Sequence, residues 1–436
     1  MKYIHFVGIG GIGLSALARY LKKEGFEVSG SDVKRTKITA KLETEGIKVS
    51  VPHDSENINN QDLVVYSAVI KDDNVELIKS RQQGIMTLSR KDALPLFLKD
   101  RRVFSVCGAH GKSTTSAMLA SLVEGTVIIG AESKQFDTNM FYRAGNNIIF
   151  EADESDESFL NSNPYIAVVT NAEPEHMEHY NYDIQRFHRA YEQFLKSATI
   201  RVINAEDEFL STLTDLEAIR LYPSSDIKEI KTVIRDAEPF TSFILKDLGR
   251  FEVWGMGNHI VVDASLAILA SLNEVDLETA RTMIKNYRGI KKRFDIIEKL
   301  NDFTLIDDYG HHPTEIKATM NSARKYAKMM GLKTVTAIWQ PHKYSRTYDN
   351  LQNFVNCFEE ADRLVILPVW SVGEAFIDIN FEKEFSKYNP TFVQSLKKNV
   401  NSLELIDNNE TIDKLNSGLV IGFGAGDITY QLRGIS

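Results

Sequence analysis

The sequence predicts an α/β protein with mostly parallel sheets, organised in three domains. Short β-branched runs alternate with longer stretches of helical periodicity along nearly the whole chain, which is typical of parallel strands covered by helices. Two glycine-rich turns each follow an apolar run and precede a helical pattern. A chain of 436 residues has the length of two or three ordinary domains. We expect the domains to cover residues 1–98, 99–290 and 291–436.

The first domain is predicted to contain a strand, a glycine turn, a helix and further strands. Residues 2–7 and 27–30 have strand patterns on either side of a helical pattern at 12–24. Residues 62–70 form another apolar run, and the unit ends near the segment DALPLFLKDRR.

The second and third domains repeat this alternation. The second begins at residues 103–108, and its later strand candidates are TVIIG, NIIFEAD, YIAVVTNAE and IRVINAE. Helical patterns follow at residues 260–272 and 276–287. The third domain starts after YRGIKKRFD, with FTLIDDYG, KTVTAIWQP, RLVILPV and GLVIGFGAGD as its strand candidates.

The composition is that of an ordinary soluble globular protein, with 43% hydrophobic and 25% charged residues. The net charge of −9 argues against general affinity for nucleic acids or anionic membranes. Cys107 and Cys357 are too few for a disulfide framework or a cysteine-based zinc site. We find no apolar stretch that could span a bilayer and no signal-peptide pattern, so we expect a cytoplasmic protein.

The first glycine turn has the spacing G-x-G-x-x-G and is followed by an acidic residue, Asp32, at the end of the next strand candidate. Its residues are Gly8, Ile9, Gly10, Gly11, Ile12 and Gly13. This combination is the fingerprint of a Rossmann domain, in which backbone N–H groups bind a diphosphate and the acid holds a ribose. An NAD-dependent dehydrogenase is therefore one hypothesis.

The second glycine turn predicts a phosphate-binding loop. Its residues are Gly108, Ala109, His110, Gly111, Lys112, Ser113 and Thr114. Backbone N–H groups at a helix N-terminus surround phosphate oxygens, a lysine neutralises their charge, and a Ser or Thr hydroxyl reaches Mg²⁺. The Walker spacing is not met, because Val106 stands where its first glycine belongs. A simple strand–turn–helix junction is the alternative, but the sequence GKST after a strand favours phosphate.

Two later segments offer candidate metal ligands. Glu151 is the first of five acidic residues that follow a strand candidate, and His176 follows the next one. Carboxylates at the carboxyl ends of strands can hold Mg²⁺ beside phosphates. The alternatives are a solvated acidic loop and a structural histidine.

The segment LIDDYGHHPTEIKA places polar residues at a strand-to-helix turn. Asp307 and Asp308 end the strand, and Pro313 and Thr314 open the helix, with Thr314 as the expected N-cap. Acids, a tyrosine and paired histidines at such a turn suit a ligand crevice in an open α/β sheet. A capped turn with solvated histidines is the alternative.

The segment AIWQPHKYSRTYD carries His342, Lys343 and Arg346 after another strand candidate. Cations in a crevice suit a carboxylate or phosphate partner, although basic loops are common.

Taken in chain order, these segments resemble the Mur ligases, the ATP-dependent amide-forming enzymes of peptidoglycan precursor synthesis. The resemblance covers nearly the whole chain and rests on HFVGIGGIGLSA, GSD, GAHGKSTT, EADESDESFL, TNAEPEHM, KKRFD, DDYGHHPTE, QPHKYSRT and GAGDI. It implies a Rossmann-like N-terminal domain for a UDP-sugar, a P-loop-type central domain for ATP, and a Rossmann-like C-terminal domain for an amino acid.

The resemblance also implies roles for individual residues. The turn at 8–13 with Asp32 would hold the UDP-sugar, and the loop at 108–114 the ATP phosphates. Mg²⁺ would lie among Ser113, Glu151 and His176. Arg293 would lie near the ATP phosphates, while His259 and Asp308 would help hold the nucleotide. The amino-acid and acyl-phosphate region would be lined by Tyr309, His311, His342, Lys343 and Arg346, with His311 or His342 as general base.

The implied reaction joins L-alanine to the carboxylate of UDP-N-acetylmuramate through an acyl phosphate. A family alternative adds a recycled tripeptide to the same sugar, but GIGGIGLS and DDYGHHPTE favour alanine. From other classes, an NAD-dependent dehydrogenase would explain only residues 5–32, and a non-catalytic nucleotide-binding regulator would not need EPEHM or DDYGHH.

Some positions depart from the family pattern. Where the family has G-x-H-N-x-x-N-A around the adenine, this chain keeps His259 but has Ile260 and Asp263 in place of the asparagines. Ile260 cannot hydrogen-bond the base. Lys343 stands where arginine is usual, which removes a bidentate carboxylate contact. The span 125–147 is short for the family.

Overall fold

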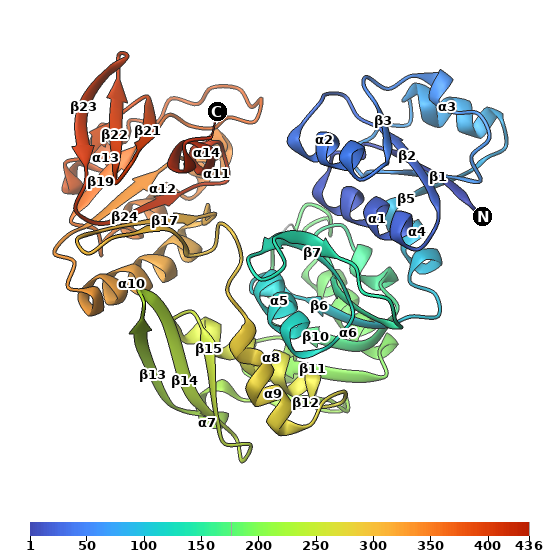
Figure 1. Cartoon of the computed structure of the whole chain (residues 1–436), viewed down its shortest axis with the longest axis horizontal. Coiled ribbons are helices and arrows are strands. Elements are labelled where there is room, and N and C mark those ends of the chain that lie inside the picture. Colours follow the sequence, from blue (N-terminus) through green and yellow to red (C-terminus); the bar gives the residue numbers. More distant parts are fainter. Residues whose placement is uncertain (176, 436) are drawn as a thin grey trace. The chain divides into compact units, whose positions relative to one another are not determined.

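The computed structural model describes residues 1–175 and 177–435, and the chain divides into two compact units. The first unit comprises Met1–Ile230, Ser242–Val253 and Asn258–Arg288, and the second comprises Lys231–Thr241, Trp254–Gly257 and Gly289–Ser436. Figure 1 labels many elements of both units, and each unit is described by itself. In the described part of the chain, no helix has the length and apolar character needed to cross a membrane.

The N-terminal domain, drawn in blue in Figure 1, is built on a five-stranded parallel sheet in the order β3-β2-β1-β4-β5. Its strands are β1 (Tyr3–Val7), β2 (Glu27–Ser31), β3 (Lys48–Ser50), β4 (Leu63–Tyr66) and β5 (Met86–Ser89). Its helices are α1 (Ile12–Lys23), α2 (Lys37–Thr44), α3 (Val75–Gln82) and α4 (Arg90–Phe97). The strand order reverses beside β1, so the first glycine turn lies at the topological switch point of a doubly wound sheet.

The central domain is built on a seven-stranded sheet in the order β12-β11-β10-β6-β9-β7-β8. Its strands are β6 (Arg102–Cys107), β7 (Thr126–Ser133), β8 (Thr138–Phe141), β9 (Asn147–Glu151), β10 (Pro164–Val169), β11 (Ile200–Asn204) and β12 (Ile219–Leu221). The sheet is parallel except for β8, which pairs antiparallel with β7 at one edge. Strand β6 lies between β10 and β9, so the second glycine turn leaves the middle of the sheet.

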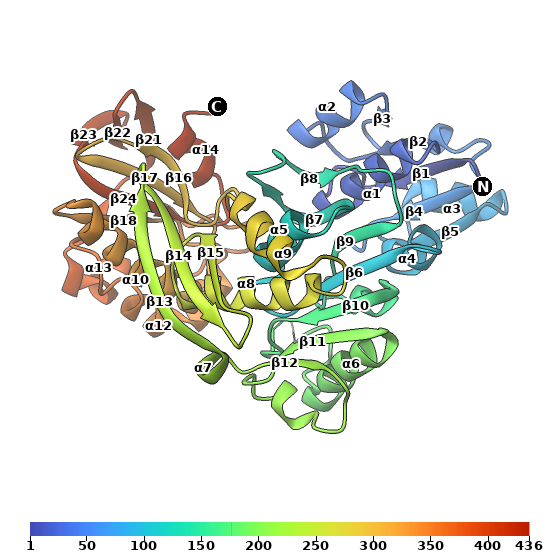
Figure 2. The same ribbon diagram turned by 60° about the horizontal axis from the view of Figure 1, so that its bottom comes forward.

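Helices of the central domain complete its layers. They are α5 (Lys112–Leu122), α6 (Ile184–Ser197), α7 (Pro223–Asp226), α8 (Asn258–Ser271) and α9 (Leu277–Met283). Helices α8 and α9 lie beside α5, as Figure 2 shows. A short three-stranded sheet of β13 (Ile227–Arg235), β14 (Glu238–Leu245) and β15 (Arg250–Trp254), which the sequence patterns did not reveal, is divided between the two units.

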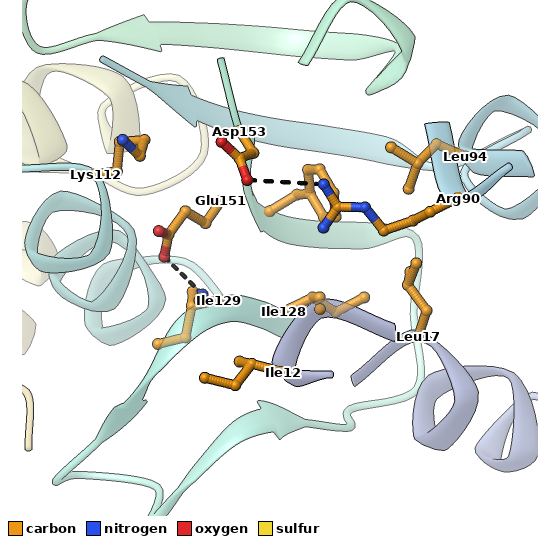
Figure 3. Close-up of a pocket in the computed structure, with 12 residues that line it drawn as sticks. Ile12, Leu17, Arg90, Leu94, Lys112, Ile128, Ile129, Glu151 and Asp153 are labelled. Atoms are coloured by element: carbon orange, nitrogen blue, oxygen red, sulfur yellow. Dashed lines mark hydrogen bonds and ion pairs between the residues drawn. The ribbon is translucent and has the colours of Figure 1, made fainter. Parts of the chain in front are cut away.

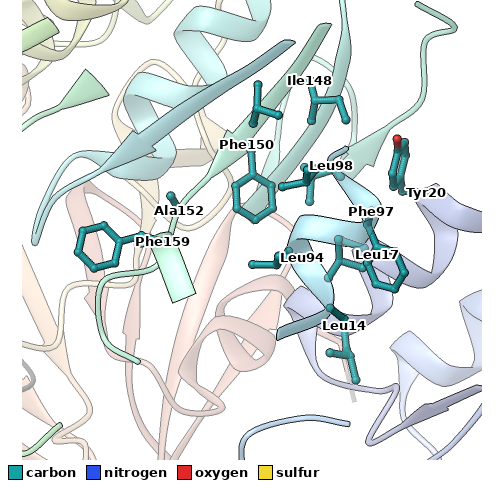
Figure 4. Close-up of a cluster of buried hydrophobic side chains, with 14 of the residues drawn as sticks. Leu14, Leu17, Tyr20, Leu94, Phe97, Leu98, Ile148, Phe150, Ala152 and Phe159 are labelled. Atoms are coloured by element: carbon teal, nitrogen blue, oxygen red, sulfur yellow. The ribbon is translucent and has the colours of Figure 1, made fainter. Parts of the chain in front are cut away.

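One apolar core runs through both domains of the first unit. It joins Leu14 and Leu17 of α1 and Leu94 and Phe97 of α4 to Phe150 of β9, all of them buried. Figure 4 shows these side chains together, although α1, α4 and β9 are far apart in the chain. Burial of side chains of this size contributes about 1.5–3 kcal/mol each. The core therefore fixes the first glycine turn relative to the strands that carry the second one.

The C-terminal domain is built on a six-stranded sheet in the order β16-β17-β24-β18-β19-β20. Its strands are β16 (Asp295–Lys299), β17 (Phe303–Asp308), β18 (Val335–Trp339), β19 (Arg363–Ile366), β20 (Thr391–Phe392) and β24 (Gly418–Phe423). Strand β16 is antiparallel to β17, and the rest of the sheet is parallel. Its helices are α10 (Pro313–Met330), α11 (Tyr344–Asp349), α12 (Leu351–Asn356), α13 (Phe381–Glu384) and α14 (Ile428–Arg433).

In the C-terminal domain, two antiparallel features add to the parallel architecture expected from the sequence. One is the reversed strand β16, and the other is a separate meander of β21 (Ser395–Asn399), β22 (Ser402–Asp407) and β23 (Glu410–Leu415). The meander packs Leu403 and Leu405 into the same core as Val420 of β24. The prediction of three α/β domains with parallel sheets is nevertheless confirmed.

A buried carboxylate ties together four segments of the N-terminal domain. Glu76, at the start of α3, is fully buried, and its Oε1 accepts hydrogen bonds from Asn57 Nδ2 (2.7 Å) and the Asp54 amide (3.2 Å). Its Oε2 accepts a hydrogen bond from the Ser31 hydroxyl and lies 3.6 Å from His5 Nε2. Burial alone would raise the pKa of Glu76, but the donors of His5, Ser31 and Asn57 lower it from 4.5 to about 2.

We predict that Glu76→Gln removes an acid-sensitive part of the stability of the N-terminal domain. The folded-state pKa lies below the unfolded value, so this contribution is present in full above pH 4.5 and is lost as the pH falls towards 2. Its size is about 3 kcal/mol. Urea unfolding of wild type and variant between pH 7 and pH 3 measures it. A difference between them that stays constant over this range would contradict the prediction, and the exposed Glu56→Gln is the control, expected to change stability by less than about 0.5 kcal/mol.

Candidate functional site

The second glycine turn needs its glycines for two reasons. Gly108 and Gly111 have φ of 141° and 81°, in the region that favours glycine. A Cβ at Gly108 would lie 2.1 Å from Thr170 Oγ1, and a Cβ at Gly111 would lie 2.5 Å from Asp263 Oδ1. The turn therefore packs against the end of β10 and against α8. Helix α5 begins directly after it, at Lys112.

Lys112 is held by three acceptors. Its ammonium donates to the carbonyls of Gly108 (2.6 Å) and Ala109 (3.1 Å) and to Glu154 Oε1 (2.9 Å). Burial would lower the pKa of Lys112, but the carboxylates of Glu154 and Glu151 raise it above its ordinary value. The lysine is therefore charged, and a phosphate that binds it must displace one of these acceptors.

Glu154 is the partner that sequence reasoning did not single out. Its side chain is 2% exposed, and burial raises the pKa of its carboxyl group, which Lys112 only partly opposes. Its Oε2 is buried and has no hydrogen-bond partner within the described residues. A buried carboxylate with one unsatisfied oxygen is costly to hold. Its pairing with Lys112 therefore offsets only part of the cost of burying its charge.

Ser113 and Glu151 lie together beside this lysine. The Ser113 hydroxyl donates to Glu151 Oε1 (3.0 Å), and Glu151 Oε2 accepts from the Gly130 amide (2.7 Å). Hydroxyl and carboxylate oxygens beside a phosphate loop suit Mg²⁺, which takes one or two protein ligands and completes its shell with phosphates and water. His176, the third predicted ligand, lies outside the described residues. Across residues 1–175 and 177–435, three or more His, Cys, Asp or Glu side chains nowhere gather into a metal site.

The other predicted ATP-loop residues have structural partners. The His110 amide donates to Asn171 Oδ1 (3.1 Å), and its ring lies 3.3 Å from Glu175. His259 is exposed on the first turn of α8. Thr114 bonds with the buried Tyr287, whose pKa is raised by burial. Tyr287 was not predicted as a site residue, because it belongs to none of the recognised motifs.

The first glycine turn is braced by the end of β2. The amides of Gly8 and Ile9 donate to the Ser31 carbonyl (2.9 and 3.0 Å), and the Gly10 amide donates to Asp32 Oδ2 (2.8 Å). Ile9 is fully buried, whereas Ile12 is exposed. Asp32 Oδ1 accepts from the Val33 amide (2.8 Å), so both oxygens already bond to the backbone.

Gly11 and Gly13 lie at the start of α1, and within the described residues no side chain caps α1 or α5. Both helix N-termini therefore keep amides available for anions.

A cavity of about 290 Å³ lies between the two glycine turns, within the first unit. Its apolar wall is made by Ile12, Leu17, Leu94, Ile128, Ile129 and Phe150. Its charged lining consists of Arg90, Lys112, Glu151 and Asp153 (Figure 3). Arg90 was not predicted as a site residue. A cavity with this lining suits a ligand that has an apolar part and an anionic group.

The predicted residues of the third domain come together at one edge of its sheet. Strands β17 and β18 both run parallel to β24, so the residues after them share an edge. The ring of His311 lies 5.2 Å from that of Tyr309 and 5.8 Å from that of His342. The Arg346 Nη1 is 3.5 Å from His342 Nδ1. Lys343 precedes α11 with a φ of 68°, outside the usual range for a non-glycine residue.

Arg293 is tied to the same edge of the sheet by an ion pair with Glu315, a residue that was not predicted. The guanidinium of Arg293 lies 5.7 Å from the Tyr309 ring and 3.1 Å from Glu315 Oε1. Burial would raise the pKa of Glu315, but Arg293 and His311 lower it to about 2. Glu315 therefore carries charge and orients both the arginine and the histidine.

Asp308 and the start of α10 are organised differently from what the sequence suggested. Asp308 is buried, accepts from the amides of Phe294 (2.7 Å) and Gly310 (2.8 Å), and has its pKa raised by burial to about 6. The expectation that Thr314 caps the helix is wrong. The N-cap is His312, because Pro313 occupies the first helical position, and Glu315 accepts from the amide of His312 (3.3 Å).

Comparison with known proteins assigns each domain a counterpart. Three family models match the chain: the Mur ligase family catalytic domain at residues 3–102, the Mur ligase middle domain at 106–270, and the Mur ligase glutamate ligase domain at 292–412. UDP-N-acetylmuramate–L-alanine ligase of Campylobacter curvus is 58% identical over 434 residues and covers 100% of both chains. The enzyme of that name from Helicobacter pylori strain P12 is 52% identical, covering 99% of this chain and 96% of the relative.

Solved structures show the same fold. The UDP-N-acetylmuramate–alanine ligase of Thermotoga maritima superimposes with a TM-score of 0.81 at 28% identity, covering 99% of this chain and 98% of that one. A murein peptide ligase of Psychrobacter arcticus has a TM-score of 0.63 at 20% identity, over 98% of this chain and 97% of that one.

We predict that Lys112→Ala lowers ATP turnover by about 100-fold or more, because one cation at the phosphates is lost. The change also leaves Glu154 buried and unpaired, which costs about 3–5 kcal/mol of stability. The double variant Lys112→Met with Glu154→Gln removes both charges. It is expected to regain most of the stability, measured by thermal unfolding, but none of the turnover. Recovery of activity in the double variant would contradict the assignment of Lys112 to the phosphates.

Proposed function

The chain belongs to the Mur ligase family, and on this premise we propose that it joins L-alanine to the carboxylate of UDP-N-acetylmuramate while ATP is converted to ADP and phosphate. The observation that carries the proposal is the cavity that both glycine turns line, through Gly13 of the first turn and Lys112 of the second. The full-length relatives that carry this activity in their names support the choice of sugar and amino acid.

We propose one role for each domain, with boundaries near residues 98 and 290. Residues 1–98 bind the UDP-sugar, residues 99–290 bind ATP, and residues 291–436 bind the amino acid. Asp32 serves mainly to shape the first turn, because both of its oxygens bond to backbone amides.

In the first half-reaction, a carboxylate oxygen of the sugar bonds to the γ-phosphorus of ATP. The bond from that phosphorus to the β,γ-bridging oxygen breaks, its electron pair leaves with ADP, and no proton moves. Two anions must meet, so Lys112 and the uncapped amides of α5 neutralise the phosphates. Ser113 and Glu151, together with His176 as the third proposed ligand, would hold Mg²⁺, which screens the phosphate charge when bound. Arg293, with its pair to Glu315, is proposed to act on the same phosphates.

In the second half-reaction, the amine of L-alanine attacks the acyl carbon, phosphate leaves, and the amine must lose a proton. Of the two histidines predicted as base, the geometry favours His311. Its Nδ1 lies 3.1 Å from the Tyr309 carbonyl and donates to it, which leaves the lone pair of Nε2 free to accept a proton. The Nδ1 of His342 faces a donor, Arg346, and burial, His311 and Arg346 lower its pKa to about 4. His342 is thus the weaker base.

The proposed function is tested by the choice of amino acid. Purified protein with ATP, Mg²⁺ and UDP-N-acetylmuramate should release phosphate on addition of L-alanine, and much less with D-glutamate or the recycled tripeptide. Omission of the UDP-sugar is the control and should abolish release. Equal turnover with the tripeptide would overturn the proposal, and a change in NADH absorbance would favour a dehydrogenase.

We predict that His311→Ala lowers kcat by about 100-fold or more, as expected for loss of a general base. Burial lowers the pKa of His311 below 6.5, so wild-type kcat should fall as the pH drops through the region below that value. The variant should lose this acid limb in a profile from pH 5 to 9. His342→Ala should retain the limb and instead raise the KM for L-alanine. A variant of His311 with an unchanged acid limb would exclude it as the base.

A further inference from the structure

We propose that Arg90, which no motif singled out, holds the carboxylate of the UDP-sugar in position for phosphorylation. The inference deepens the proposed function and rests on it. Arg90 is the first residue of α4 and lines the cavity between the two glycine turns, as Figure 3 shows.

One edge of the guanidinium is held by the acidic segment after β9. Arg90 Nη2 donates to Ser158 Oγ (3.1 Å) and Asp156 Oδ2 (3.3 Å) and lies 3.7 Å from Asp153 Oδ2. These contacts are at the long end of the hydrogen-bond range. They orient the guanidinium but leave some of its N–H donors unused. The side chain stays 24% exposed.

The other edge of the guanidinium keeps free donors, and Arg90 lines the cavity. Within the described residues, Nε and Nη1 of Arg90 make no hydrogen bond, although an arginine has five N–H donors. A Cβ at Gly13 would lie 2.5 Å from Nη1, so the guanidinium covers the last glycine of the first turn. The absence of a side chain at Gly13 is what lets the arginine lie there.

Free donors distinguish Arg90 from Lys112, although Asp153 and Asp156 pair with its charge. Arg90 and Lys112 are the two cations among the described lining residues, and Glu151 and Asp153 are the two anions. The ammonium of Lys112 is already bonded to three acceptors. An anion that enters the cavity therefore finds unpaired donors on Arg90.

The substrate offers one anion that fits this place. Its diphosphate belongs on the glycine turn, its sugar is neutral, and its lactyl carboxylate must reach the γ-phosphate at Lys112. A guanidinium between the two turns can donate to one carboxylate oxygen while the other oxygen attacks phosphorus. The apolar wall of the cavity accepts the methyl group next to that carboxylate.

Lys91 provides a matched control. It is the next residue of α4, and its ammonium contacts the same acidic segment, at the Asp156 carbonyl (3.3 Å) and Glu157 Oε2 (3.5 Å). It does not line the cavity. Arg90→Met and Lys91→Met therefore each remove a tie to this segment, but only the first removes a cavity cation.

The experiment measures kcat, the KM of each substrate, and the inhibition constant of UDP-N-acetylglucosamine, which has the same UDP but no lactyl carboxylate. Arg90→Met is expected to raise the KM of UDP-N-acetylmuramate about 10- to 100-fold and to lower kcat, as loss of a charge-assisted hydrogen bond predicts. The KM of ATP and the inhibition constant should stay within about twofold of wild type. Arg90→Lys should fall between wild type and Arg90→Met, and Lys91→Met should resemble wild type.

Two results would overturn the inference. Equal effects of Arg90→Met and Lys91→Met would make Arg90 a structural tie. An equal loss of affinity for both nucleotide sugars would assign Arg90 to the diphosphate. Failure of the proposed function appears separately, as wild-type protein that does not turn over UDP-N-acetylmuramate with L-alanine.

Discussion

The structure must hold two polyanionic substrates close together although they repel each other. The apolar packing of α1 and α4 against β9 provides the support that opposes this repulsion. Unit charges 4 Å apart repel by about 4 kcal/mol near a protein surface. The shared core, with Leu17, Leu94 and Phe150, fixes two helix N-termini on either side of one cavity without placing charge in the contact. Few cations are then needed at the cavity, because the apolar core, and not the cations, sets the distance between the two helix N-termini.

The acidic segment after β9 shows how this scaffold handles charge. Its carboxylates have side-chain partners within the fold: Glu151 bonds to Ser113, Glu154 to Lys112 and Glu157 to Arg186, while Asp153 and Asp156 share Arg90. The segment contacts the second glycine turn through Lys112 and α4 through Arg90. Ion pairs with Lys112, Arg90 and Arg186 offset much of the negative charge of this segment.

Most of the architecture could be predicted from the sequence because it depends on local pattern. The glycine turns, the strand before Lys112 and the helix after Pro313 all rest on neighbouring residues. The strands of the three-stranded sheet were missed because alternating patterns such as that of β14 are weak beside the longer apolar runs. Arg90, Glu154 and Glu315 were missed because their roles come from partners far along the chain or in the next turn: Arg90 meets Asp156 across 66 residues. Spacing within one segment cannot reveal such pairs.

The pairing of Lys112 with Glu154 has a consequence for ligand design. The loop holds a carboxylate of its own, so a phosphate mimic must be anionic enough to exchange with it, and part of its binding free energy is used in that exchange. A neutral compound that fills the apolar wall of Ile128 and Phe150 and leaves the pair intact avoids this cost. Its affinity would then depend on shape, as it does in the interior of any folded protein.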